Sequence, residues 1–167
     1  MRYASIRELD ISNGEGVGVA LFVQGCHFHC YNCFNPDTWD FNGGKEWTQD
    51  TEDKLIELAS RPYIKRLSIL GGEPLADENL DGVLHLVNRF RLLLPEKTIW
   101  LYSGYTFEEC LLNTKRREIL KNTDVMVDGR YIDSQRDITL KWRGSSNQRV
   151  IDIKQSIKQN ELVLYCN

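Results

Sequence analysis

Three cysteines in one short stretch constrain this chain more than any other feature of its sequence. Cys26, Cys30 and Cys33 are spaced four and three residues apart, and they follow an apolar run at 19–23 that is typical of a buried strand. An iron–sulfur cube is normally held by four cysteine thiolates. Three thiolates with no fourth nearby would leave one iron free to bind a small molecule and pass an electron to it. Catalytic zinc sites keep a coordination position open for the same reason.

Two other interpretations of this stretch stay open. His27 or His29 could join the three thiolates in a structural Cys3His zinc site, because thiolate and imidazole ligands suit zinc. Alternatively, the cysteines could be small buried side chains that bind nothing. Zinc sites usually divide their ligands into two pairs on separate elements. The compact spacing therefore favours the open iron–sulfur cluster.

A second motif lies downstream of the cysteines. Residues 66–70 predict a short buried strand, and Gly71-Gly-Glu-Pro74 follows it directly. Two glycines let the backbone approach a ligand closely, and the carboxylate of Glu73 can accept hydrogen bonds from a cationic amine. Such a turn means little alone, since strand ends are often rich in glycine and proline. Together with the cysteines it predicts one shared site.

The combination of the two motifs resembles the radical S-adenosylmethionine enzymes. More narrowly, the chain is similar to the activating enzymes of the anaerobic (class III) ribonucleotide reductase, over about residues 10 to 150. The last of the matching stretches, 142–148, separates this family from the related pyruvate formate-lyase activases. The matching stretches are Asn13-Gly-Glu-Gly16, Leu21-Phe-Val-Gln-Gly-Cys26, Cys33-Phe-Asn-Pro-Asp-Thr-Trp39, Gly71-Gly-Glu-Pro74, Ile99-Trp-Leu-Tyr-Ser-Gly-Tyr105, Asp124-Val-Met-Val-Asp-Gly129 and Trp142-Arg-Gly-Ser-Ser-Asn-Gln148.

The resemblance implies an oxidoreductase with two cofactors. Cys26, Cys30 and Cys33 would ligate one 4Fe–4S cluster, whose fourth iron binds S-adenosylmethionine. One electron then splits the cofactor into methionine and a 5′-deoxyadenosyl radical. That radical would take a hydrogen from a glycine of the reductase large subunit and leave a glycyl radical there. The implied electron donor is flavodoxin or ferredoxin. Two alternative functions stay open: activation of another glycyl-radical enzyme of the pyruvate formate-lyase type, and a non-enzymatic, zinc-stabilised binding module.

By the same resemblance, several residues are candidates for binding S-adenosylmethionine, and the Gly-Gly-Glu turn would hold its amine. They are Asn32, Cys33, Phe34, Gly71, Gly72, Glu73, Ser103 and Asp128. The chain departs from its relatives at three positions. Asn32 stands where many radical enzymes have an aromatic residue, Glu15 where relatives often have proline, and Gly18 where they often have arginine. The sequence assigns no role to His27, His29, Cys110, Cys166 or the loop at 142–148.

Predicted strands and helices alternate along the chain. Strands are predicted at 2–11, 17–24, 66–70, 98–102, 124–127 and 162–165, and helices at 48–60, 78–93, 107–113 and 115–121. Alternation of this kind indicates an α/β fold with a parallel sheet. At 167 residues the chain is too short for a full eight-fold barrel of about 250 residues. We therefore expect an incomplete TIM-like (β/α) barrel with about five or six mainly parallel strands.

This fold prediction also gives the domain organisation and the place of the site. We expect a single domain over 1–167, with a cluster loop at 25–47 and a C-terminal extension at 150–167. Ligands of open α/β sheets bind beyond the carboxyl ends of the strands. Cys26, Glu73, Ser103 and Asp128 all fall at such ends.

Bulk properties narrow the function further. A formal net charge of −3 gives no general reason to expect nucleic-acid binding. No apolar segment approaches the 18 or so residues of a membrane span, and the N-terminus lacks the apolar core of a signal peptide. Five cysteines, an odd number, argue against a secreted disulfide framework. We therefore expect a cytoplasmic protein.

Overall fold

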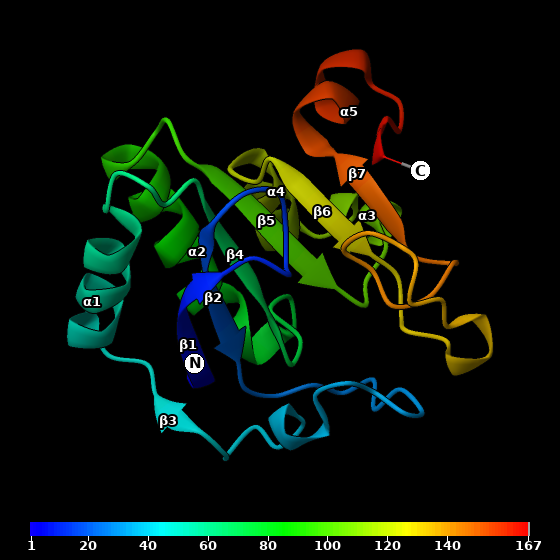
Figure 1. The fold of residues 1–167 in the computed structure, drawn as a ribbon, viewed down its shortest axis with the longest axis horizontal. Helices are drawn as coiled ribbons and strands as arrows, with labels where there is room; N and C mark the ends of the chain where they lie inside the picture. The colour runs from blue at the N-terminus through cyan, green and yellow to red at the C-terminus, as the bar shows by residue number, and fades with distance from the viewer. Residues whose placement is uncertain (167) are drawn as a thin grey trace.

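The apolar segments of the sequence form the strands of one mixed sheet in the computed structural model of the protein, which describes residues 1–166 (Figure 1). Asn167, the last residue of the predicted extension, lies outside the described part. The order of strands across the sheet is β3-β1-β2-β4-β5-β6-β7-β8. Their bounds are β1 Arg2–Asp10, β2 Gly18–Val23, β3 Lys45–Glu46, β4 Arg66–Gly71, β5 Thr98–Ser103, β6 Val125–Asp128, β7 Arg149–Asp152 and β8 Leu164–Cys166.

The prediction of five or six mainly parallel strands is wrong in both number and direction. Within residues 1–166 the sheet has eight strands, and only the pairings β2–β4, β4–β5 and β5–β6 are parallel. The pairings β1–β2, β1–β3, β6–β7 and β7–β8 are antiparallel. Parallel neighbours need a crossover, usually a helix, whereas a short turn returns the chain antiparallel. A short turn joins β1 to β2, and no α-helix lies between β6 and β7, so both pairs are antiparallel.

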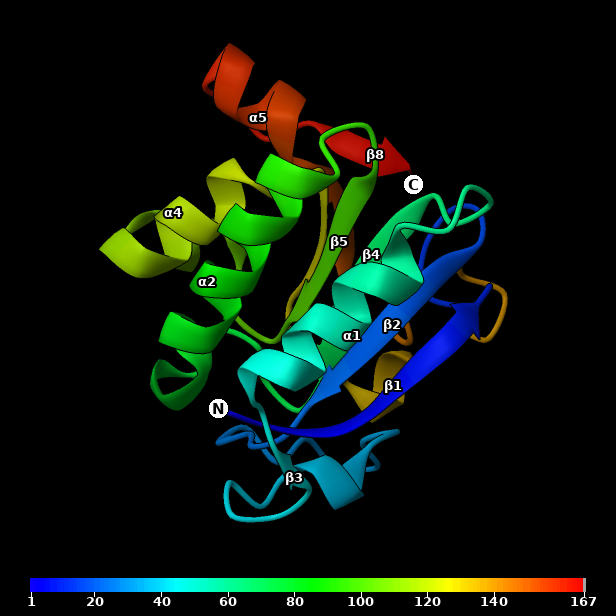
Figure 2. The same cartoon turned by 90° about the vertical axis from the view of Figure 1, so that its left-hand side faces the viewer.

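In the described part of the chain, five α-helices and two 3-10 turns connect the strands. Their bounds are α1 Gln49–Ala59, α2 Asp77–Leu93, α3 Phe107–Leu111, α4 Thr114–Lys121, α5 Ile153–Gln159, η1 Pro36–Thr38 and η2 Asp133–Gln135. Thr48 caps α1 as predicted, because its side chain accepts a hydrogen bond from the Thr51 amide at 3.2 Å. Figures 1 and 2 show α1, α2 and α4 on the same face of the sheet. No helix among residues 1–166 combines the length and apolar character needed to cross a bilayer.

Alternation along the central strands gives the sheet two different faces. Leu21, Ile69 and Leu101 are fully buried in the core that the helices cover. Their neighbours in the chain, Phe22, Leu70 and Tyr102, line a cavity instead. Successive side chains of a strand point to opposite faces of its sheet. The cavity therefore lies against the face that α1, α2 and α4 leave free.

The loop between β6 and β7, residues 129–148, contributes to this free face. Trp142 adopts a left-handed backbone with φ of 62°. Its ring packs edge-on against Trp100 of β5, with ring centroids 4.9 Å apart, and lies 6.0 Å from the ring of Tyr165. A bulky residue is rare at positive φ and persists only where its surroundings fix it. These aromatic contacts supply that constraint, and they anchor the loop to the sheet.

A buried ion pair crosses three strands beneath the free face. Asp10 of β1, Gly18 of β2 and Arg66 of β4 lie side by side in register. Arg66 donates to the Asp10 carboxylate at 2.8 Å, and both side chains are fully buried. A Cβ atom on Gly18 would lie 2.5 Å from the Arg66 side chain. Glycine at position 18 therefore leaves room for the Arg66 side chain to pass over it.

Candidate functional site

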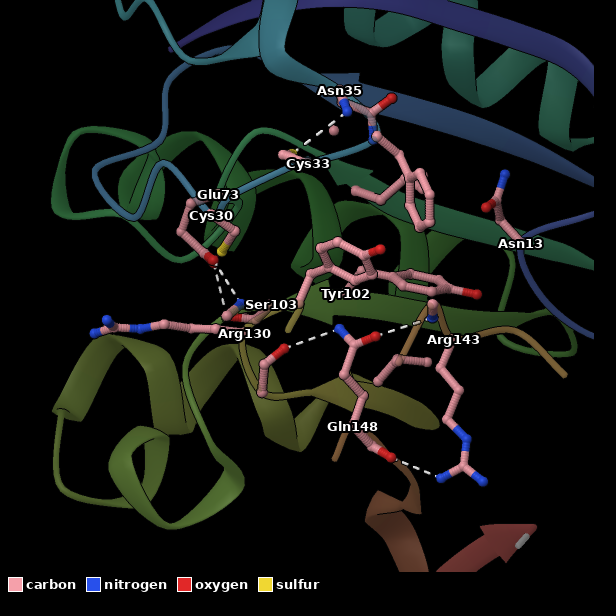
Figure 3. Close-up of a pocket in the computed structure, with 18 of the residues that line it drawn as sticks. Asn13, Cys30, Cys33, Asn35, Glu73, Tyr102, Ser103, Arg130, Arg143 and Gln148 are labelled. Atoms are coloured by element: carbon pink, nitrogen blue, oxygen red, sulfur yellow. Dashed lines mark hydrogen bonds between the residues drawn. The ribbon is translucent and has the colours of Figure 1, made fainter. Parts of the chain in front are cut away.

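A cavity of about 620 Å³ opens at the carboxyl ends of β2, β4 and β5 and continues along the free face of the sheet (Figure 3). Most of the residues predicted from the sequence line it together: Cys26, Cys30, Cys33, Phe34, Gly71, Gly72, Glu73 and Ser103. Asn32 and Asp128 do not line it. The two motifs therefore meet in one cavity, although they lie far apart in the sequence.

The conformation of the cysteine loop brings the three thiols to one wall. The amide of Cys26 donates to the carbonyl of Trp39 at 3.1 Å, which fixes the start of the loop against η1. The amide of Cys33 donates to the carbonyl of Cys30 at 3.1 Å and closes a tight turn. His29 and Asn32 have left-handed backbones, with φ of 49° and 56°. Few non-glycine residues adopt this conformation, and it is common at functional sites.

All five cysteines of the chain are free thiols. Burial raises the pKa of Cys26 and of Cys30, and a neighbouring cysteine raises each further. The amide of Asn35 donates to Cys33 Sγ at 3.4 Å. Thiols bind metals as thiolates, so metal binding at this wall would release protons.

Neither histidine of the loop lines the cavity. His27 Nε2 lies 2.7 Å from the carboxylate of Glu78, and the His29 ring stacks on Trp39 with centroids 4.5 Å apart. Within residues 1–166, no three side chains of His, Cys, Asp or Glu are arranged to hold a single metal ion. The Cys3His zinc alternative therefore lacks an imidazole that faces the three thiols.

Glu73 is the buried acidic residue of the cavity, with 2% of its surface exposed. Its Oε1 accepts hydrogen bonds from Ser103 Oγ at 2.7 Å and from the Leu75 amide at 2.9 Å, and its Oε2 accepts from the Gly104 amide at 2.7 Å. Burial raises the pKa of Glu73, whereas these three donors act in the opposite direction. The carboxylate is thus fixed in place by donors from β5 and from the turn after β4.

The two glycines before Glu73 allow the turn to pack against the cysteine loop. A Cβ atom on Gly71 would lie 2.7 Å from the Val23 nitrogen, and the φ of Gly71 is +104°. A Cβ atom on Gly72 would lie 2.5 Å from the carbonyl oxygen of Gly25. The amide of Glu73 donates to that same Gly25 oxygen at 2.7 Å. Glycine is therefore needed here for contact between backbones, as well as for any approach to a ligand.

The remaining predicted residues lie around the cavity in different ways. Phe34 lines its mouth, half exposed, with its ring centroid 4.9 Å from that of Tyr131. Asn32 points outward, and its Nδ2 donates to Asp133 at 3.1 Å. Asp128 is buried, where it pairs with Arg149 and accepts from the Phe107 amide at 2.7 Å. Asp128 therefore fixes the start of α3.

Two further lining residues, Trp39 and Tyr102, were not predicted to be part of the site. Trp39 Nε1 and the Tyr102 hydroxyl are buried and have no hydrogen-bond partner among the described residues. Both residues lie in the matching stretches of sequence, but nothing local marks their polar atoms as unpartnered. The sulfurs of an iron–sulfur cluster accept hydrogen bonds. Three free thiols, in a cavity that Trp39 also lines, therefore suit a cluster.

Comparison with known proteins agrees with the chemistry of this cavity. A family model described as a 4Fe-4S single cluster domain matches residues 12–151. Three relatives named anaerobic ribonucleoside-triphosphate reductase-activating protein come from Vibrio cholerae, Escherichia coli K12 and Enterobacteria phage T4. The Vibrio cholerae protein is 43% identical over 89% of this chain and 96% of its own length. The Escherichia coli K12 protein is 40% identical over 90% of this chain and 97% of its own length. The phage T4 protein is 40% identical over 90% of this chain and 93% of its own length. The chain belongs to the family of anaerobic ribonucleoside-triphosphate reductase-activating proteins.

Proposed function

We propose that this chain is an activating oxidoreductase that generates the glycyl radical of the anaerobic ribonucleotide reductase. The observation that carries the proposal is the shared cavity, in which three free cysteines face the Gly-Gly-Glu turn. Cys26, Cys30 and Cys33 would hold one 4Fe–4S cluster, and S-adenosylmethionine would bind beside it. When bound, the cluster supplies the electron that splits S-adenosylmethionine into methionine and a 5′-deoxyadenosyl radical.

Glu73 would bind and orient the amine of S-adenosylmethionine. A carboxylate offers about four acceptor positions, and internal donors occupy three of those of Glu73. The remaining position, on Oε2, can accept from an ammonium group, which would also favour the charged carboxylate. Ser103 acts through Glu73, because its hydroxyl donates to Oε1. Gly71 and Gly72 keep the turn against the cysteine loop.

The other predicted residues would act at the edge of the site. We propose that Phe34 covers the adenine side of the bound cofactor, supported by its place at the mouth of the cavity. Asn32 would contribute through its backbone, since its side chain is bonded to Asp133. Asp128 would hold α3 beside the cofactor rather than contact it, given its bonds to Arg149 and Phe107.

We further propose that the curved sheet is an incomplete barrel whose open side admits the reductase large subunit. A primary alkyl radical attacks almost any C–H bond within reach, so the target glycine must enter the cavity before the cofactor is cleaved. Flavodoxin or ferredoxin would supply the electron. A cytoplasmic location is supported by the five free cysteines, because a reducing compartment keeps thiols unpaired.

Electron spin resonance with purified partners tests this function. The chain is reconstituted without oxygen, its iron, sulfide and zinc are measured, and it is mixed with S-adenosylmethionine, a strong reductant and the reductase. We expect about four irons per chain and a glycyl radical signal on the reductase. Pyruvate formate-lyase in place of the reductase is the matched control and should give no signal. A colourless chain with one zinc, or a signal on pyruvate formate-lyase alone, would overturn the proposal.

A further inference from the structure

Asn79 is a buried polar residue of α2 that belongs to neither of the two motifs in the cavity. It is 1% exposed and does not line the cavity itself. Its Nδ2 donates to the carbonyl of Gln24 at 3.2 Å and to the carbonyl of Glu73 at 2.9 Å. Gln24 directly precedes Gly25 and Cys26, whereas Glu73 belongs to the Gly-Gly-Glu turn. One side-chain amide therefore joins the start of the cysteine loop to the acidic turn.

The side chain of Gln24 extends this connection into the cysteine loop. It is buried, and its Nε2 donates to the carbonyl of Asp37 at 3.0 Å and to that of Asp40 at 2.9 Å. Trp39 lies between these two residues, and its carbonyl accepts from the Cys26 amide at 3.1 Å. A displacement of Gln24 would therefore reach the loop both before and after the three cysteines.

Helix α2 gives the Asn79 side chain a fixed place. Asn79 lies in the first turn of the helix, where its own amide donates to the Ala76 carbonyl at 2.8 Å. The next residue, Leu80, and Val83 one turn further are buried in the hydrophobic core. The two segments that Asn79 joins are irregular backbone, whereas Asn79 itself belongs to a helix packed on the sheet. Sites supported by such elements are held more precisely than sites on loops alone.

We propose that Asn79 is a positioning residue that sets the separation between the three thiols and the Glu73 carboxylate. The backbone bond from the Glu73 amide to the Gly25 carbonyl also joins the two motifs, but it ties neither of them to a helix. The inference rests on the proposed function. A cofactor that must reach both the cluster and Glu73 binds well only if their spacing fits it. Loss of the Asn79 amide should therefore weaken binding of S-adenosylmethionine while the cysteines still hold the cluster.

Asn79→Leu tests this, because leucine has nearly the shape of asparagine and no hydrogen-bond donor. The proteins are reconstituted without oxygen, and three quantities are measured: the melting midpoint, the iron content and the Kd for S-adenosylmethionine, from the change it causes in the electron spin resonance spectrum of the reduced cluster. Leu120→Ala is the control for lost stability, since Leu120 is fully buried in α4 and lies outside the cavity. Both variants should melt at a lower temperature and keep about four irons per chain. Only Asn79→Leu should bind S-adenosylmethionine more weakly, by roughly three- to tenfold.

A double-mutant cycle with Glu73→Gln distinguishes positioning of Glu73 from a general loosening of the fold. If Asn79 acts through Glu73, Asn79→Leu should weaken binding by less than about twofold further in the Glu73→Gln background. Equal effects in the two backgrounds would overturn the inference, as would an unchanged Kd or a loss of iron from Asn79→Leu alone. Asn79→Ser, which keeps one donor on a shorter side chain, is judged by the same criteria if Asn79→Leu does not fold. A wild-type chain that holds no cluster or does not bind S-adenosylmethionine would instead overturn the proposed function, and this inference with it.

Discussion

Gly72 is the position where one added methyl group should disturb the site most directly. An alanine Cβ at this position would lie 2.5 Å from the carbonyl oxygen of Gly25 and 2.9 Å from that of Thr38. Both are backbone atoms, so no side-chain rotation can relieve the contact. Gly25 and Thr38 are themselves joined by a hydrogen bond of 2.6 Å at the start of the cysteine loop. Gly72→Ala should therefore push the cysteine loop away from the Gly-Gly-Glu turn.

The size of the effect follows from these contacts. Overpacking by one methyl group typically costs about 1–3 kcal/mol, and two backbone contacts place this variant at the upper end. The displaced loop also weakens the Glu73 amide bond to Gly25, which is worth roughly 1 kcal/mol. We expect a loss of about 3–4 kcal/mol in the free energy of unfolding. Domains have about 5–15 kcal/mol in total, so the variant should still fold.

Urea unfolding without oxygen and iron content after reconstitution measure the two consequences. Gly72→Ala should unfold at a lower urea concentration and retain less iron, because Cys26 directly follows Gly25. Gly82→Ala is the control, since the close neighbours of Gly82 belong to the side chain of the N-terminal Met1, which can move. A Gly72→Ala protein as stable as wild type and with a full cluster would refute the reasoning.

Three further predictions concern single side chains. Cys30→Ala should assemble no four-iron cluster while Cys166→Ala, outside the cavity, still does; equal iron and sulfide contents would contradict the ligand assignment. Asp10→Asn leaves Arg66 buried and unpaired, and should lower the free energy of unfolding by about 3–5 kcal/mol in urea titrations. Burial acts to raise the pKa of Asp10, but its hydrogen bonds, the strongest from Arg66, lower it overall. The wild type should therefore lose the stability that ionised Asp10 contributes as pH falls below about 4. Asp10→Asn should show no such loss. Burial raises the pKa of Glu73, so the stability that protonated Glu73 contributes is present below about pH 4.3 and is lost as pH rises through the folded pKa. Glu73→Gln should remove this decline in the free energy of unfolding. Parallel pH profiles for the variant and the wild type would contradict the prediction.

Much of the site could be predicted because its signals are local. The cysteine spacing and the Gly-Gly-Glu turn each lie within a few residues, and both contribute to the cavity as expected. The helices were found from their caps and periodicity; α1 begins after Thr48 and α2 spans Asp77–Leu93, close to the predicted bounds. Capping and amphipathic periodicity depend on neighbours in the chain, so the sequence alone determines them.

Other features depend on partners that lie far apart in the sequence. Strand pairing decides the antiparallel direction of the strands at both sides of the sheet. It also decides the places of β7 and α5, which the sequence analysis left as an extension. Asp128 lies at the end of its strand, as predicted. Its ion-pair partner Arg149 comes from β7, and this pair holds the Asp128 carboxylate away from the cavity lining. Arg66 reaches Asp10 only because Gly18 lies between them in register.

Sequence by itself indicated the chemistry that we propose for this protein, because the three thiols and the acidic turn are encoded at fixed short spacings. Tertiary structure alone decided how the cavity is walled. Trp142 anchors the loop 129–148 to the free face, and the Tyr102 hydroxyl is left without a hydrogen-bond partner among residues 1–166. The physical reason is that the whole fold decides which groups come within hydrogen-bond distance of a buried polar atom, and therefore whether that atom has a partner.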